Sequence, residues 1–350
     1  MTRLPHPGHC ALRSPRLYTK ISGPFGAAAP VRKVYGGGLV RKGVKRDFLG
    51  VLDAEKDFVA IVELAANLKN RARAGELYEP LKNKNLAMIF EKSSTRTRVS
   101  FEVGMAQLGG HALYLNPQDL QLGRGETIAD TARVLSRYVD AIVYRAHRHA
   151  DVVELARWAT VPVINALDDL EHPCQALADL FTVQEHKGDL KALKLAYVGD
   201  GNNVCHSLLL ACAVVGMDIA VACPDKFRPN ATVLKQAKEV AARTGAKVAV
   251  GPDPVDAAKG ADALYTDVWV SMGMEKERAE RERIFLPYQV NQQLVNKAKD
   301  DAIVLHCLPA HRGLEITDEV MDGPKSVVWD QAENRLHAQK ALLVKLLGGA

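Results

Sequence analysis

The chain has 350 residues, of which 47% are hydrophobic and 25% charged, as in a globular protein long enough for two domains. No apolar stretch approaches the roughly 20 residues of a membrane helix, so we expect no membrane partner. The six cysteines lack the paired spacing of a zinc site or a disulfide framework. We therefore predict a cytoplasmic protein, because a reducing compartment suits unpaired thiols.

The net charge of +5 is carried by the first 46 residues. They contain ten Lys and Arg and no acid, which leaves 36 basic and 41 acidic residues in the remainder, a net charge of −5. Their prolines and the triple glycine at 36–38 are typical of a disordered segment. An organellar transit peptide, an arm for nucleic acid or membrane surfaces, and an inert extension all fit. The prolines and glycines interrupt the amphipathic helix that a transit peptide needs. We favour the inert extension and expect no nucleic-acid partner.

From Asp47 the apolar periodicity predicts alternating helices and strands. The expected helices are 58–68, 99–108, about 127–139, 151–158 and 173–185, and the expected strands are 86–90, 111–115, 141–144 and 161–166. Such alternation predicts an α/β domain with a mainly parallel sheet.

An anion site is predicted where the strand 86–90 gives way to the sequence EKSSTRTR at 91–98. A helix N-terminus carries unpaired N–H groups and a partial positive charge, and arginine matches phosphate oxygens two at a time. The alternative is a helix cap rich in Ser and Thr, although one such residue suffices for a cap. Arg145 ends the strand 141–144, and because ligands gather at the carboxyl ends of parallel strands, we expect Arg145 to join the site.

A second helix start is predicted at His172, since Pro173 suits the first turn of a helix. Gln175 would lie in that first turn. The helix dipole disfavours an imidazolium ion, so His172 would be neutral and able to donate a hydrogen bond to a carbonyl oxygen. The alternative is that His172 only ends a loop.

The second half repeats the pattern, with expected strands at 193–198, 219–223, 263–266, 303–306 and 326–329 and a final helix that carries Arg335. Gly199 and Gly201 resemble the opening of a dinucleotide fingerprint, but the third glycine is replaced by Val204. Asn203 instead suits an amino-acid head group. Asp267 ends the strand 263–266 and could hold an ammonium, with Ser271 four residues later. The charged run 275–283 is interpreted as a mobile surface loop.

The sequences STRT at 94–97, HPCQ at 172–175, Asp267 with SMG at 271–273, and HCLP at 306–309 resemble the motif set of the ornithine carbamoyltransferase family. The resemblance extends from about residue 47 to 347. It implies an α/β fold of two domains, each a mainly parallel sheet flanked by helices, with the C-terminal helix packing back on the first domain. The implied boundaries are an extension at 1–46, a carbamoyl phosphate-binding domain at 47–186 plus 331–350, and an ornithine-binding domain at 190–330.

The resemblance also implies the reaction: carbamoyl phosphate and L-ornithine give L-citrulline and phosphate, in arginine and urea-cycle metabolism, without metal or organic cofactor. The residues implied in carbamoyl phosphate binding are Ser94, Thr95, Arg96, Thr97, Gln121, Arg145, His172, Gln175, Cys307, Leu308 and Arg335. Those implied in ornithine binding are Asn203, Asp267, Ser271 and Met272, and Arg96, His172 and Cys307 would be catalytic. Family members are trimer-based, and Gln121 matches a position that a neighbouring subunit donates.

The δ-amine must lose a proton before it attacks, and either a Cys307 thiolate or the departing phosphate could receive that proton. Charge that grows on the carbonyl oxygen could be stabilised by Arg96, Thr97, Arg145 and His172. The competing hypotheses are a carbamoyltransferase for another amine such as putrescine or N-acetylornithine, a catalytically silent phosphate-binding protein on the same scaffold, and a dehydrogenase.

Overall fold

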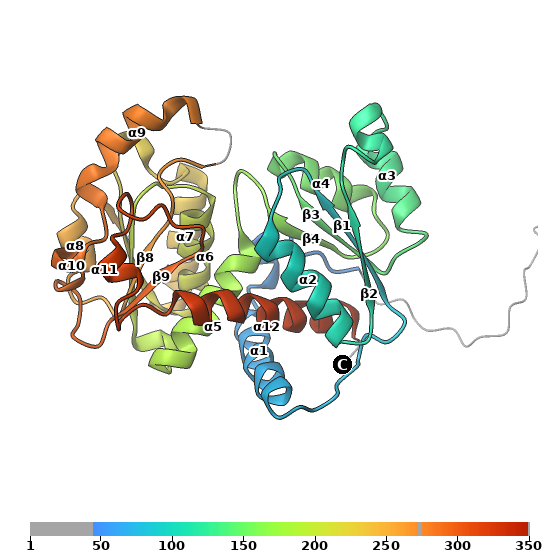
Figure 1. The fold of residues 1–350 in the computed structure, drawn as a ribbon, viewed down its shortest axis with the longest axis horizontal. Helices are drawn as coiled ribbons and strands as arrows, with labels where there is room; N and C mark the ends of the chain where they lie inside the picture. Colours follow the sequence, from blue (N-terminus) through green and yellow to red (C-terminus); the bar gives the residue numbers. More distant parts are fainter. Residues whose placement is uncertain (1–44, 272–274, 349–350) are drawn as a thin grey trace, which may run out of the picture. The chain divides into compact units, whose positions relative to one another are not determined.

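Four parallel strands in the order β2-β1-β3-β4 form the first sheet of the computed structural model, which describes residues 45–271 and 275–348 (Figure 1). The strands β1 and β3 are almost wholly buried, as expected for strands covered on both faces. The strands are β1 (Asn85–Phe90), β2 (His111–Leu115), β3 (Ala141–Arg145) and β4 (Val163–Leu167). The helices of this half are α1 (Phe58–Arg73), α2 (Thr95–Gln107), α3 (Ile128–Leu135), α4 (His149–Trp158) and α5 (Pro173–Lys187).

Five parallel strands in the order β7-β6-β5-β8-β9 form the second sheet. They are β5 (Lys194–Val198), β6 (Asp218–Ala222), β7 (Val248–Gly251), β8 (Ala263–Thr266) and β9 (Ile303–His306). The helices of this half are α6 (Asn203–Val215), α7 (Ala231–Thr244), α8 (Pro254–Ala258), α9 (Arg278–Phe285), α10 (Gln292–Val295) and α11 (Asp318–Met321). Two parallel sheets flanked by helices confirm the predicted fold class.

The final helix α12 (Val328–Leu347) packs back on the first half, as predicted. Its buried face carries Ala338, Ala341 and Leu342, which join a core cluster that also contains Phe58 of α1 and Phe181 of α5. Both sheets belong to one compact unit, Val44–Ala350. The domain boundaries at 186 and 331 therefore stay a prediction, and so does the character of the basic extension, because residues 1–44 lie outside the described part.

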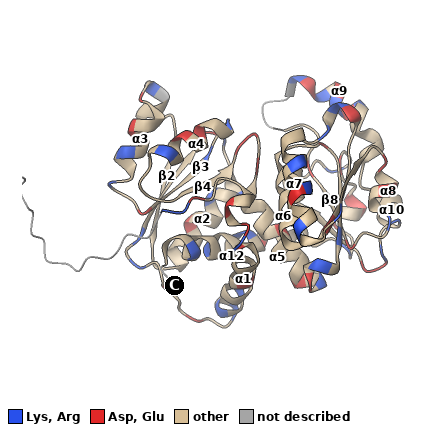
Figure 2. Cartoon of the chain, turned by 180° about the vertical axis from the view of Figure 1, so that it is seen from behind, with Lys and Arg blue, Asp and Glu red and all other residues tan. Residues whose placement is uncertain are grey.

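Two predicted elements are wrong. The segment 326–329 is no strand: only Ser326 forms an isolated bridge, with Val304, and α12 begins at Val328. The run 275–283 is helical rather than a loop, and Figure 2 shows both signs of charge along α9. Its Arg281 is buried and donates to Asp200 (2.8 Å) and to the carbonyl oxygen of Trp269 (2.9 Å). Burial of this one guanidinium anchors the helix.

Among the described residues, no helix combines the length and the apolar character that crossing a membrane requires.

Candidate active site

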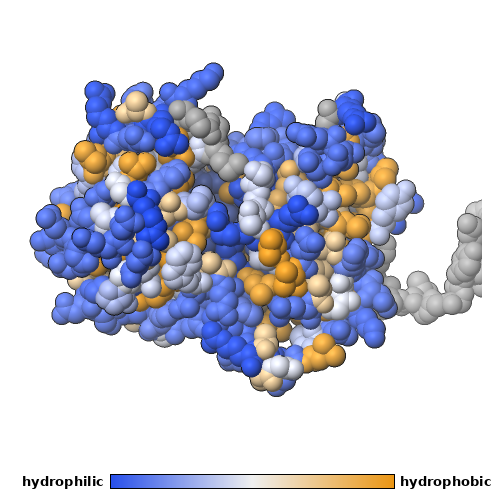
Figure 3. Space-filling model, in the orientation of Figure 1, coloured by the Kyte–Doolittle hydropathy of each residue, from blue (hydrophilic) through white to orange (hydrophobic). Residues whose placement is uncertain are grey.

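A cavity of about 520 Å³ opens between the two sheets, and the space-filling view shows a hollow with largely hydrophilic walls (Figure 3). Most of the predicted site residues line it: Ser94, Thr95, Arg96, Thr97, Arg145, His172, Asn203, Asp267, Ser271, Cys307, Leu308 and Arg335. Gln175 does not line the cavity and is buried behind it. Gln121 is exposed in a short 3-10 helix away from the cavity. Met272 lies outside the described residues.

Strand register brings the first half of the site together. Phe90 of β1 is paired with Arg145 of β3, so the segment after β1 emerges beside Arg145. Glu91 fastens the two strand ends: its N–H donates to the Arg145 carbonyl oxygen (2.9 Å), and its carboxylate accepts from the Tyr144 hydroxyl (2.6 Å). The rule that ligands gather at the carboxyl ends of parallel strands therefore predicted the neighbourhood correctly.

The helix α2 starts at Thr95, four residues earlier than the apolar stripe indicated. Ser94 is its N-cap, and its side chain accepts from the Thr97 N–H (3.2 Å). The hydroxyl-rich run therefore does cap a helix, but only Ser94 performs that role. The first turn of α2, with Arg96, borders the cavity and directs a partial positive charge toward it.

Three arginines from separate elements make the cavity strongly cationic. Burial, together with the charges of Arg335 and Arg96, lowers the pKa of Arg145 to about 10. Burial likewise lowers the pKa of Arg335. The Nε atoms of Arg145 and Arg335 are buried without a hydrogen-bond partner among the described residues. Buried donors that lack an acceptor are rare in folded proteins, so these groups indicate an anionic ligand.

The surroundings of His172 favour the neutral imidazole that the sequence predicts. His172 is the N-cap residue of α5, followed by Pro173 at the first helical position. Burial lowers its pKa well below 6.5, and the charges of Arg335, Arg145 and Arg96 act in the same direction. Its backbone N–H donates to the Ser207 hydroxyl (2.8 Å), which fixes the backbone at the start of α5.

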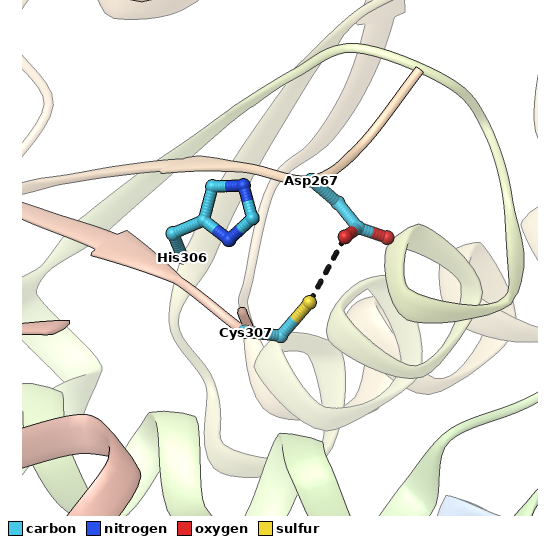
Figure 4. Close-up of side chains that lie close together, drawn as sticks. All are labelled: Asp267, His306 and Cys307. Atoms are coloured by element: carbon cyan, nitrogen blue, oxygen red, sulfur yellow. Dashed lines mark hydrogen bonds between the residues drawn. The ribbon is translucent and has the colours of Figure 1, made fainter. Parts of the chain in front are cut away.

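Register also assembles the second half of the site. Thr266 of β8 is paired with His306 of β9, so Asp267 and Cys307 leave the sheet side by side (Figure 4). The Cys307 thiol donates to the Asp267 carboxylate (3.0 Å). Burial and the negative charge of Asp267 raise the pKa of Cys307 well above 9.0. The raised pKa favours the thiol over the thiolate in this arrangement.

Asp267, His306 and Cys307 offer ligand atoms within 4.8 Å of one another, a spacing at which a metal must be considered. The His306 ring is already engaged: Nδ1 accepts from the Leu308 N–H (2.8 Å), and Nε2 faces the Glu315 carboxylate (3.1 Å). A metal ligand needs a free imidazole lone pair and a deprotonated thiol. The residues present therefore fit a hydrogen-bonded cluster better than a metal site.

Sequence reasoning missed several residues of this site. Asn202, rather than its neighbour Asn203, donates to Asp267 (2.8 Å), whereas Asn203 donates to the Asp168 carbonyl oxygen (2.7 Å). Lys92, Arg278 and His311 line the cavity without having been predicted. Only Lys92 carried a signal, because it lies inside the predicted anion sequence.

Comparison with known proteins agrees with this geometry. Residues 46–185 match the carbamoyl-P binding domain of aspartate/ornithine carbamoyltransferase, and residues 191–346 match its Asp/Orn binding domain. The chain is 60% identical over 307 residues to the ornithine carbamoyltransferase of Methanoculleus marisnigri, covering 87% of this chain and 98% of the relative.

Two solved structures show the same arrangement. Ornithine carbamoyltransferase from Pyrococcus furiosus is 58% identical with a TM-score of 0.85, covering 88% of this chain and 98% of that one. Ornithine transcarbamoylase from Giardia lamblia is 35% identical with a TM-score of 0.80, covering 87% and 99%. The chain therefore belongs to the aspartate/ornithine carbamoyltransferase family.

Proposed function

We propose that this protein transfers the carbamoyl group of carbamoyl phosphate to the δ-amine of L-ornithine, giving L-citrulline and phosphate. The observation that carries the proposal is the meeting, in one cavity, of three arginines with the Asp267–Cys307 pair. The reaction is a step of arginine metabolism and uses no metal or organic cofactor.

The phosphate binds at the α2 end of the cavity. The hydroxyls of Ser94 and Thr95 and the N–H groups of the first α2 turn accommodate its oxygens, and Arg96, Arg145 and Arg335 balance its charge. Neutral His172 donates to the carbamoyl oxygen, where negative charge grows in the transition state. The guanidinium groups stabilise the same charge, because it develops on the ligand they already hold.

Ornithine binds at the other end. Asp267 holds the α-ammonium, assisted by Ser271 and Met272, and Asn203 holds the carboxylate. The δ-amine then faces the carbamoyl carbon: a C–N bond forms, the C–O bond to phosphate breaks, and the amine proton must leave. The departing phosphate takes this proton, because the raised pKa of Cys307 makes a thiolate acceptor scarce.

The test is citrulline formation from carbamoyl phosphate with ornithine, putrescine, N-acetylornithine and aspartate offered separately to the purified protein. Turnover only with ornithine is expected, because Asp267 offers a carboxylate to an α-ammonium that putrescine lacks and acetylation neutralises. Preference for another amine would overturn the role of Asp267 and retain the phosphate half. No carbamoyl transfer to any amine would favour a silent phosphate-binding protein.

We also propose a homotrimer in which a neighbouring copy completes each cavity. A groove lies beside the site on α2, lined by Ser93–Thr95 at its cavity end. Two apolar side chains of this groove are unusually exposed, Val99 at 51% and Val103 at 40%. Gln121 is exposed and does not line its own cavity, which supports its donation to a neighbour.

Mixing two inactive variants tests this arrangement. Arg96→Gly damages a subunit's own cradle, and Gln121→Ala damages the residue given to a neighbour. In a mixed trimer, a Gln121→Ala subunit supplies an intact Arg96 and an adjacent Arg96→Gly subunit supplies an intact Gln121 to the same cavity. Part of the activity should therefore return on mixing. Sedimentation at monomer mass, or no recovery after subunit exchange, would contradict the shared site.

We retain the proposal of a cytoplasmic location, which the free thiols of Cys174, Cys205, Cys212, Cys223 and Cys307 support. A fluorescent protein fused to the C-terminus should fill the cytoplasm. Fluorescence in an organelle would instead favour a transit peptide at residues 1–46.

A further inference from the structure

Asp179 of α5 is fully buried and has no part in the chemistry described above. One oxygen of its carboxylate, Oδ1, accepts from two amide groups: Nε2 of Gln175 (2.8 Å) and Nε2 of Gln331 (2.6 Å). Both glutamines are only 1% exposed. Because Oδ1 of Asp179 accepts from both amides, each glutamine turns its NH₂ group toward Asp179 and its oxygen away from it.

The outward oxygen of Gln175 controls Arg335. It accepts from Nη1 of Arg335 (2.7 Å), and Nη2 of the same guanidinium donates to the Thr97 hydroxyl (2.5 Å). Both acceptors are uncharged, so they orient the guanidinium plane without cancelling its charge. The full positive charge of Arg335 is therefore available to an anion in the cavity.

The outward oxygen of Gln331 controls the opposite wall. It accepts from the backbone N–H of His306 (2.9 Å), the last residue of β9. The next residue is Cys307, whose thiol lies against Asp267. Gln331 therefore fixes the strand end from which the amine-binding side of the cavity is built.

We propose that Asp179 is a positioning residue that aligns both halves of the site: Arg335 through Gln175, and the Cys307 turn through Gln331. The inference rests on the proposed function, which assigns phosphate to the first half and the amine to the second. Without the carboxylate, either amide can rotate by 180° and direct its NH₂ group at the N–H donor that it now accepts from. Two donors would then face each other, and the guanidinium or the strand end would shift.

Substitutions at Asp179 separate hydrogen bonding from charge. Asp179→Asn keeps one oxygen that can accept from both glutamines, whereas Asp179→Leu has a similar volume and keeps none. Burial raises the pKa of Asp179 to about 7, so the site already accommodates a neutral carboxyl group and should tolerate asparagine. Gln175→Met and Gln331→Met cut one branch each while preserving side-chain length.

Steady-state kinetics of citrulline formation, combined with calorimetric titration of inorganic phosphate, tests the proposal. Asp179→Asn should stay within about threefold of the parent protein. Asp179→Leu should lower kcat/KM for both substrates by about 10- to 100-fold, the usual effect of leaving buried groups unpaired. Gln175→Met should chiefly weaken the binding of carbamoyl phosphate and inorganic phosphate. Gln331→Met should chiefly lower kcat/KM for ornithine.

If Asp179→Leu had the same kinetic and phosphate-binding constants as the parent protein, the inference would be overturned. An Asp179→Asn variant as impaired as the leucine variant would also overturn it. If Asp179→Leu does not fold, the two methionine variants decide. An equal loss of kcat/KM for both substrates in each variant would contradict the separate branches. A parent protein that makes no citrulline refutes the proposed function instead. Weaker phosphate binding in Gln175→Met would still support the Arg335 branch in that case.

Discussion

Replacement of Cys307 by serine is the most informative test of how the amine loses its proton. If a Cys307 thiolate were the general base, its loss would lower kcat by about 10²- to 10⁴-fold. The structure indicates a much smaller effect. The thiol donates to Asp267 at 3.0 Å, and a serine hydroxyl can donate to the same carboxylate.

The expected magnitude follows from the ionisation of the thiol. Even at the ordinary pKa of 9.0 only about one thiol in eleven would be ionised at pH 8, and burial beside Asp267 raises that pKa further. This small thiolate population favours the departing phosphate as the proton acceptor. Serine should therefore cost at most about tenfold in kcat, or about 1.4 kcal/mol, through the shorter reach of its hydroxyl to Asp267.

The assay is the pH dependence of kcat between pH 6 and pH 10 for the parent protein, Cys307→Ser and Cys307→Ala. The serine variant should keep the parental profile. The alanine variant, which cannot donate to Asp267, should chiefly raise the KM for ornithine. A fall of more than about 100-fold in kcat for serine, together with loss of an ionisation above pH 8, would refute the reasoning and restore the thiolate as proton acceptor.

Three further predictions concern binding and stability. Asp267→Ala should raise the KM for ornithine by about 10- to 100-fold, with the KM for carbamoyl phosphate unchanged in initial-rate kinetics. Arg281→Met should destabilise the fold by about 3 kcal/mol or more in urea denaturation, because it leaves the buried carboxylate of Asp200 without its partner. Burial raises the pKa of Glu171 from 4.5 to about 7, so the folded state keeps a proton that the unfolded chain has lost, and stability falls as pH rises between these values. In urea denaturation at a series of pH values, Glu171→Gln should remove about 3 kcal/mol of the fall in the free energy of unfolding between pH 4.5 and 7. An unchanged dependence of this free energy on pH would contradict the prediction.

Local pattern predicted the site where the cause is local. Ser94 caps α2, and Pro173 starts α5 directly after His172, because capping chemistry acts within a few residues. The strand-end rule then placed Arg145 and Asp267 at the carboxyl edges of their sheets, since parallel register brings those edges together. These features needed only spacing and residue type.

Non-local packing decided the elements that the sequence did not reveal. The run 326–329 contains two adjacent valines and a tryptophan, which favour a strand, yet Val328 is buried in the first turn of α12. Arg281 resembled a solvent-exposed residue until its partner Asp200, 81 positions away, was known. Asn202 and Asn203 are indistinguishable by spacing, and only the helix start at Asn203 shows which amide turns toward Asp267.

Electrostatics explains why the cavity is divided as it is. Burial and the charges of Arg335 and Arg96 lower the pKa of Arg145, and burial and the charge of Arg96 lower the pKa of Arg335, so the fold holds like charges together at a cost in stability. Arg335 donates its hydrogen bonds within the fold to the neutral side chains of Gln175 and Thr97, which preserves its attraction for a dianion. Asp267, the one carboxylate among the described residues that line the cavity, contacts a thiol and an amide rather than a cation. Each wall thus keeps its charge for a ligand of opposite sign, and binding both ligands brings the reacting amine and carbonyl into contact.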